Sequence, residues 1–148
     1  MTTLKAQINE DMKSAMRAKD TLKLSTVRLL LAAIKQQEVD TREDVSDEDV
    51  LSIVTKMVKQ RKDSAKIYQD ANRQDLADKE LAEITTLEAY LPEALSNDAI
   101  AAIISAAIAE SQAEGMKDMG KVMAIVRPKV VGQADMGEVS RLIKAALN

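Results

Sequence analysis

The chain has 148 residues, of which 46% are apolar and 30% charged, a composition typical of a folded globular protein rather than a disordered one. It contains no cysteine and no histidine, which excludes disulfides, Ser-His-Asp and Cys-His catalytic groups, and metal sites built on these ligands. The net charge of −3 and the presence of two tyrosines as the sole aromatic residues argue against a basic, base-stacking nucleic-acid-binding protein.

The first 91 residues contain neither glycine nor proline, the strongest signals for turns. This absence predicts long helices joined by short polar connections. The second helix is expected to begin after Asp20 and to turn five residues toward the core: Leu22, Val27, Leu30, Leu31 and Ile34. The third begins at Ser46, because Asp49 three residues later completes a capping box. The first, third and fourth helices are expected at about 3–18, 46–70 and 74–90.

The segment 90–98, YLPEALSND, marks the expected domain boundary. Pro92 disfavours the helical conformation in the residue before it, and Ser96 or Asn97 can cap a new helix. Three helices are expected beyond it, at about 97–113, at about 118–128 and after Asp135. The predicted fold is therefore all-α, with an N-terminal four-helix domain, 1–92, and a small C-terminal three-helix domain, 96–148.

No apolar stretch approaches the roughly 18 residues of a membrane span. The first residues, MTTLKAQINEDMK, lack the apolar core of a signal peptide. We therefore expect a cytosolic protein with no membrane partner. No set of side chains has the spacing of a metal or cofactor site, so neither is expected.

A basic stripe is expected on the third helix, where four lysines recur every three or four residues: Lys56, Lys59, Lys62 and Lys66. Arg73 would extend the stripe if the helix continued that far. Such a stripe can follow the phosphates of a nucleic acid. Asp63 and Asp70 lie in the same arc, so the pattern equally fits the solvated face of a long helix.

The C-terminal domain is predicted to have an uneven charge distribution. Residues 93–116 contain four acidic residues and no basic one, whereas residues 117–148 contain six basic residues against three acidic ones. The basic residues are Lys117, Lys121, Arg127, Lys129, Arg141 and Lys144. This layout suits docking onto phosphates or onto an acidic protein. It also fits the ordinary preference of basic side chains for the C-terminal ends of helices.

The glycines of this domain do not form a phosphate-binding loop. In the pair Gly120-Lys121, the next residue is Val122, whereas a P-loop requires Ser or Thr there to bind magnesium. Gly115 is expected to end the fifth helix, and Gly120 to permit close contact between helices.

Three segments carry a resemblance to a known family: RLLLAAIKQQEVD (28–40), RKDSAKIYQDANRQDLADKELAEITTLEAYLP (61–92) and MGKVMAIVRPKVVGQADMGEVSRLIKAAL (119–147). Together they resemble the GatB/YqeY family over nearly the whole chain, and most closely its stand-alone YqeY-like members. The last third is similar to the tail domain of the B subunit of glutamine-dependent aminoacyl-tRNA amidotransferases.

The resemblance implies an N-terminal helical domain followed by a three-helix tail, the part of the amidotransferase that meets tRNA. Its catalytic centres lie elsewhere, so this chain is not expected to be a carbon–nitrogen ligase on its own. Carried over to this chain, the signature includes Gly120, Gly132 and Asp135, of which Gly132 would make a turn and Asp135 would cap the last helix. The family's common GRADG loop reads GQADM here, so Gln133 replaces an arginine and Met136 a glycine.

Two functions from different classes follow. The first is a non-catalytic RNA-binding accessory, with tRNA as partner, linked to tRNA amidation or translation. Its contacts would be Lys117, Lys121, Lys129, Arg141 and Lys144. The second is an adaptor that docks helix to helix onto a protein of the amidotransferase or translation machinery and does not bind RNA. A third, weaker alternative is a part in a ligase activity that partner subunits supply.

Overall fold

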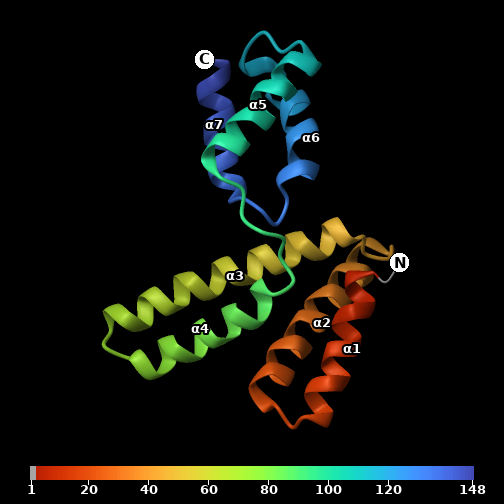
Figure 1. Cartoon of the computed structure of the whole chain (residues 1–148), viewed down its shortest axis with the longest axis vertical. Coiled ribbons are helices and arrows are strands. Elements are labelled where there is room, and N and C mark those ends of the chain that lie inside the picture. The colour runs from red at the N-terminus through yellow and green to blue at the C-terminus, as the bar shows by residue number, and fades with distance from the viewer. Residues whose placement is uncertain (1–2) are drawn as a thin grey trace. The chain divides into compact units, whose positions relative to one another are not determined.

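The computed structural model describes residues 3–148 (Figure 1). That range contains seven α-helices, one 3₁₀ turn and no strand, so the all-α expectation is confirmed. The elements are α1 (Leu4–Arg17), α2 (Thr21–Thr41), α3 (Asp47–Asp70), α4 (Gln74–Glu88), α5 (Asn97–Ser111), η1 (Met116–Asp118), α6 (Met119–Val130) and α7 (Met136–Leu147). The chain divides into two compact units: the first ends at Leu91 and the second is Pro92–Asn148.

The first unit consists of two helical hairpins, α1–α2 and α3–α4, joined through contacts of α2 with α3 and α4 (Figure 1). Its core draws on every helix of the unit, including Ile8, Leu30, Val54 and Leu87, each fully buried. The expected core position Leu22 is wrong: its side chain is 42% exposed. It lies in the first turn of α2, at the edge of the face that Val27, Leu30 and Ile34 bury.

Helices α2 and α3 start where their capping residues predict. Asp20 accepts a hydrogen bond from the Lys23 amide at 3.1 Å. Ser46 and Asp49 form the reciprocal capping box, with distances of 3.1 Å and 2.9 Å. Each bond satisfies an amide that the first turn of a helix leaves without a partner, so the helix starts are fixed locally.

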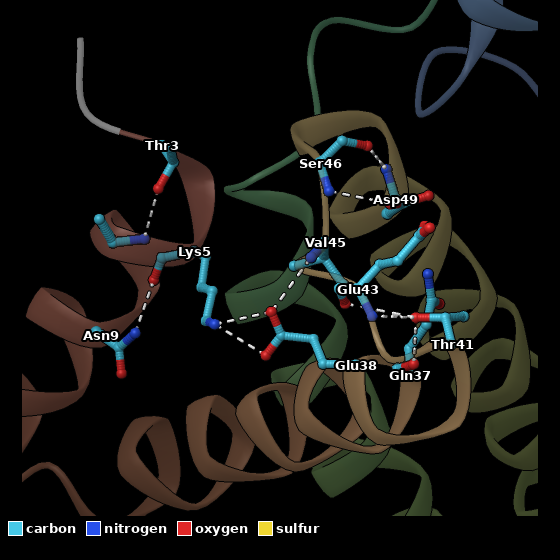
Figure 2. A network of polar contacts seen from close by, with 11 residues as sticks. Thr3, Lys5, Asn9, Gln37, Glu38, Thr41, Glu43, Val45, Ser46 and Asp49 are labelled. Carbon is cyan, nitrogen blue, oxygen red and sulfur yellow. Dashed lines mark hydrogen bonds and ion pairs between the residues drawn. The ribbon is translucent and has the colours of Figure 1, made fainter.

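Glu38, in the last turn of α2, links the end of this helix to the first turn of α1 and to the segment just before α3 (Figure 2). Lys5 of α1 donates to both carboxylate oxygens of Glu38, at 2.8 Å and 2.9 Å. The Val45 amide, just before α3, donates to the same carboxylate at 3.2 Å. These hydrogen bonds, the one from Lys5 first, lower the pKa of Glu38 below its ordinary value.

The connections of the first unit contain no glycine, and each has one residue in the left-handed region. These residues are Lys19, Arg42 and Asn72, with φ of 56°, 60° and 59°. Left-handed backbone strains a residue with a Cβ, and asparagine tolerates it best. The polar connections therefore form at some cost in backbone energy.

The second unit is a three-helix bundle of α5, α6 and α7. Its core is aliphatic, with Ala107, Val122, Val126, Val139 and Ile143 at zero exposure. The sixth helix runs two residues beyond its predicted end, to Val130, with Pro128 inside it. Proline breaks a helix mainly in its interior, whereas here it lies in the last turn, and Val130 beyond it is held in the core.

Two expectations for glycines in this unit are wrong. The fifth helix ends at Ser111, and Gln112, not Gly115, takes the left-handed position, with φ 55°. Gly115 is extended, with φ 173°. Gly120 is exposed, and a Cβ built on it would meet nothing within 4 Å, so it permits no close helix contact.

Candidate functional site

The five proposed RNA-contacting residues all lie on the surface of the second unit. Lys117 is in η1, Lys121 and Lys129 are on α6, and Arg141 and Lys144 are on α7. Since α6 and α7 run in opposite directions (Figure 1), the start of α6 lies beside the end of α7. This arrangement groups Lys121 with Lys144, and separates Lys129 from Lys121 by eight residues, about 12 Å along α6.

Three of these five cations have a carboxylate partner. Lys117 lies 3.7 Å from Glu114, and Lys121 lies 3.4 Å from Asp118. Arg141 donates from its Nε and from one Nη nitrogen to the two carboxylate oxygens of Glu138, one turn earlier on α7. A paired cation has less charge to offer a phosphate, because its carboxylate competes at short range.

Two of the partner carboxylates, Asp118 and Glu138, have a lowered pKa. The Glu114 amide donates to Asp118 at 3.0 Å, and this bond, followed by the neighbouring Lys121, lowers the pKa of Asp118. The hydrogen bond from Arg141 likewise lowers the pKa of Glu138, and Glu138 raises the pKa of Arg141. Both pairs therefore persist at neutral pH.

Lys129 and Lys144 differ from the other three. Both side chains are exposed, and within residues 3–148 neither has a carboxylate within ion-pair distance. Arg127, which was not among the five proposed contacts, shares this property and lies two residues from Lys129. The free positive charge of this unit therefore lies near the C-terminal end of α6 and near the C-terminal end of α7, which are at opposite ends of this antiparallel pair of helices.

The loop between α6 and α7 is held by backbone and side-chain hydrogen bonds. Gly132 has φ 77°, a conformation that glycine adopts without strain. Asp135 accepts a hydrogen bond from the Gly137 amide at 2.9 Å, at the start of α7. Gln133 donates to the Glu93 carbonyl at 3.1 Å and accepts from the Leu95 amide at 2.9 Å. Gln133 therefore fastens the segment before α5 to this loop instead of presenting a charge to solvent.

A groove of about 410 Å³ lies between α5 and α7. Its polar lining includes Asp98, Ser105, Glu138 and Arg141. Arg141 is already bound to Glu138, so the groove offers more negative than positive charge to a ligand. Among the described residues no group of three or more acidic side chains is placed to hold a metal ion.

The four lysines of the proposed stripe on α3, Lys56, Lys59, Lys62 and Lys66, are all exposed. Lys62 lies 3.6 Å from Glu88 of α4. Arg73 does not extend the stripe, because α3 ends at Asp70 and Arg73 forms two hydrogen bonds with Asp75, at 3.1 Å and 3.0 Å. The arrangement is that of a solvated helix face with mixed charges.

A more basic segment was missed in the sequence. Residues 13–35 hold six basic side chains and one acidic one: Lys13, Arg17, Lys19, Lys23, Arg28, Lys35 and Asp20. The last five of the six cations are exposed and have no carboxylate within ion-pair distance in the described part of the chain. A running sum of charge along the sequence, rather than a search within single helices, would have found this segment.

The chain is similar to proteins of one known family. The family model described as "Yqey-like protein" matches residues 5–147. Among curated proteins, the chain is 44% identical over 85 residues to "Altered inheritance of mitochondria protein 41, mitochondrial" of Vanderwaltozyma polyspora, covering 57% of this chain and 46% of that protein. The proteins of the same name from Eremothecium gossypii and Pyrenophora tritici-repentis are 36% and 29% identical, covering 96% and 93% of this chain and 79% and 77% of theirs.

The match thus spans about half the length of the first of these relatives. The expected cytosolic location is wrong by this comparison, since the relatives are named as mitochondrial proteins. The lack of an apolar signal core had little bearing on it, because organelle transit peptides are amphipathic rather than apolar. None of the helices described in residues 3–148 has the length and apolarity needed to cross a membrane.

Proposed function

The chain belongs to the Yqey-like protein family, and from this premise we propose that it is a non-catalytic helical module that binds structured RNA, tRNA first, as an accessory to tRNA amidation or translation. The second unit makes the contact. The observation that carries the proposal is that two exposed lysines, Lys129 on α6 and Lys144 on α7, have no carboxylate within ion-pair distance in the part of the chain that the structure describes, and that Arg127, two residues before Lys129, has none there either. Lysines free of carboxylates are the groups that gain most from replacing the counterions of a phosphate backbone.

The contact is to the backbone and shape of the RNA rather than to its bases. Both tyrosines of the chain, Tyr68 and Tyr90, lie in the first unit, and the chain has no Phe or Trp. Without an aromatic platform the second unit cannot stack splayed bases. Lys117, Lys121 and Arg141 take a smaller part than the sequence suggests, because their carboxylate partners must first be displaced.

Binding of the purified full chain to tRNA and to a length-matched unstructured RNA, over a salt series, tests the proposal. We expect preference for tRNA and a logarithmic salt slope of roughly −0.7 to −0.9 per phosphate neutralised. Lys129→Ala/Lys144→Ala should weaken binding and make the slope shallower by about two phosphates' worth. Lys117→Ala/Lys121→Ala is the matched control, since it removes the same charge from the same unit but takes paired lysines.

Equal losses of RNA affinity in the two double variants would show that net charge alone drives binding. Lys129 and Lys144 would then not form the binding site. An affinity independent of salt, or no binding of either RNA, would overturn the proposed function. A second candidate, protein docking, is favoured by a different observation, the exposed apolar face of α2.

A further inference from the structure

Helix α2 has apolar side chains on its exposed side as well as on its buried one. Three large ones are exposed: Leu22 by 42%, Leu29 by 47% and Val39 by 60%. Together with the exposed residues Ser25, Ala32 and Gln36 they follow an alternating spacing of three and four. This spacing is that of a helix seam that packs against another helix. We call these six positions the α2 stripe.

A groove of about 370 Å³ lies at the N-terminal half of the stripe. It is lined by Thr21, Leu24, Ser25, Arg28 and Leu29, all from α2. Arg28 is exposed and forms no hydrogen bond or ion pair with any described residue. The groove therefore combines apolar walls with a guanidinium free to bind a carboxylate in two-pronged geometry.

The charges beside the α2 stripe have one sign over most of its length. Arg28 and Lys35 lie seven residues apart, two helical turns, and so on the same edge. Lys19, just before α2, adds positive charge at the N-terminal end. The acidic residue next to the stripe, Asp40, lies at its C-terminal end, where it accepts a hydrogen bond from Gln36 at 2.8 Å.

From this geometry we propose that the α2 stripe binds an acidic amphipathic helix of another protein. The partner's apolar residues pack on Leu22 and Leu29, and its carboxylates pair with Arg28 and Lys35. Apolar burial supplies affinity in such a contact, and the charges set orientation and partner choice. The site lies in the first unit and does not depend on the RNA-binding lysines of the second.

A second copy of the chain fits this surface less well. In an antiparallel pairing that sets Leu22 opposite Val39, Arg28 of one copy faces Lys35 of the other, and like charges meet. Three large apolar side chains are also few for a stable dimer, which buries about 800 Å² per partner. The phosphates of an RNA would pair with the cations, but Leu22, Leu29 and Val39 would then face charged phosphates instead of an apolar partner.

The probe is a designed helical peptide about three heptads long, with leucine along one seam and glutamate on both flanks. A second peptide carries lysine in place of every glutamate. Binding to the full chain is followed by fluorescence anisotropy. We expect the acidic peptide to bind and the basic peptide not to bind. Arg28→Glu/Lys35→Glu should weaken the acidic peptide on the order of tenfold or more and admit the basic one.

Matched controls come from α3. Lys59→Glu/Lys66→Glu makes the same change of charge on another exposed helix face, and Ile67→Ser alters a side chain that is 66% exposed. Both should leave binding unchanged, whereas Leu22→Ser/Leu29→Ser should abolish it. Lys129→Ala/Lys144→Ala should also leave it unchanged, so failure here and failure of the RNA proposal are distinguishable.

The proposal is overturned if the acidic peptide does not bind, or if the α3 controls weaken it as much as the α2 variants do. It is also overturned if the free chain is a dimer that Leu29→Ser makes monomeric, since a second copy then occupies the stripe. If tRNA displaces the peptide from the α2 stripe, and still does so in Lys129→Ala/Lys144→Ala, the surface binds RNA instead.

Discussion

Tyr90, just beyond α4, donates its phenolic hydrogen to Asp11 of α1 at 2.5 Å, joining positions 79 residues apart in the sequence. The Tyr90 residue is 8% exposed, and its ring belongs to the core of the first unit. Burial, followed by the hydrogen bond to Asp11 and its charge, raises the pKa of Tyr90 well above the ordinary value. The contact closes the first unit on itself, because it links its first helix to its last turn.

This relationship predicts a loss of stability at high pH. Below a pH of about 10, the pKa of an unfolded tyrosine, both states hold the proton and the contribution of Tyr90 is complete. As the pH rises further, the unfolded state loses its proton while the folded state keeps it. The free energy of unfolding must therefore fall until the folded pKa is reached.

Denaturant midpoints measured from pH about 8 to 11 check this prediction. Tyr90→Phe should have a lower midpoint than the wild type at the lower pH, and the difference should shrink as the pH rises. Tyr68→Phe is the control, and it also isolates the ultraviolet signal of the Tyr90 phenolate. A phenolate that appears at an ordinary tyrosine's pH in Tyr68→Phe would contradict the account.

A second prediction concerns the ion pair between Arg61 of α3 and Glu83 of α4. Their nitrogen–oxygen distance is 2.8 Å, the side chains are 14% and 10% exposed, and Arg61 also donates to the Met57 carbonyl. Glu83→Ala should lower the free energy of unfolding by about 3 kcal/mol, because it leaves a largely buried guanidinium without its carboxylate. Arg61→Met/Glu83→Leu should lie within about 1 kcal/mol of the wild type, since an apolar pair can replace a buried ionic one. Equal losses in both variants, measured by urea unfolding, would show that packing rather than charge is at stake.

The left-handed residues predict stabilising substitutions. Arg42→Gly and Gln112→Gly should each raise the free energy of unfolding by about 0.5–1 kcal/mol, because glycine removes the strain of the Cβ at φ 60° and 55°. Asn72→Gly should gain less, since asparagine tolerates this region. Gly132→Ala should lose about 1 kcal/mol or more at φ 77°. A gain at Asn72 as large as at Arg42 would mean that strain is not the cause.

The connections between helices show which helix ends can be predicted from the sequence and which cannot. Ser46 and Asp49 predict the start of α3, because capping is a contact between residues three apart. The usual preference for glycine in the left-handed position predicts Gly115 at the end of α5, yet Gln112 takes that position. A preference of about 1 kcal/mol is small beside the packing of a helix, so the more typical residue does not always win.

In the candidate site, too, some contacts can be predicted from the sequence and others cannot. The pairing of Arg141 with Glu138 can be inferred from the sequence, because the two residues are three apart on one helix. Whether a side chain at Gly120 would meet another helix depends on how α6 is rotated in its bundle, which no local pattern gives; in the structure a Cβ there would meet nothing within 4 Å. The pattern places Leu22 in the core for a similar reason: α2 is apolar on two sides, and the sequence does not say which side is covered by other helices.

The carboxylate of Glu38 predicts an acid-sensitive link between α1, α2 and the start of α3 (Figure 2). Its lowered pKa stabilises the fold fully above about pH 4.3, the unfolded value, and this contribution is lost as the pH falls through the folded value. Glu38→Gln should therefore lower the urea midpoint at neutral pH and converge with the wild type in acid. Lys5→Met should have the same effect on the urea midpoint. Glu10→Gln, at an exposed carboxylate of α1, should change neither the midpoint at neutral pH nor its dependence on pH. A Glu38→Gln midpoint that runs parallel to the wild type at every pH would contradict this role.

The last prediction uses the pair on α7 and rests on the proposed RNA contact. Glu138→Gln removes the carboxylate that accepts from Nε and one Nη of Arg141, so a cation becomes free on α7, the helix that carries Lys144. RNA affinity at low salt should rise several-fold, and the salt slope should steepen by about 0.7 to 0.9, one further phosphate. Glu110→Gln is the matched control, because it removes an exposed carboxylate of α5 in the same unit and makes the same change in net charge. If the two variants raise affinity equally, the freed guanidinium does not contact the RNA. If Glu138→Gln gains and Glu138→Gln/Arg141→Gln returns to the wild-type slope, Arg141 is a contact that its own helix normally restrains.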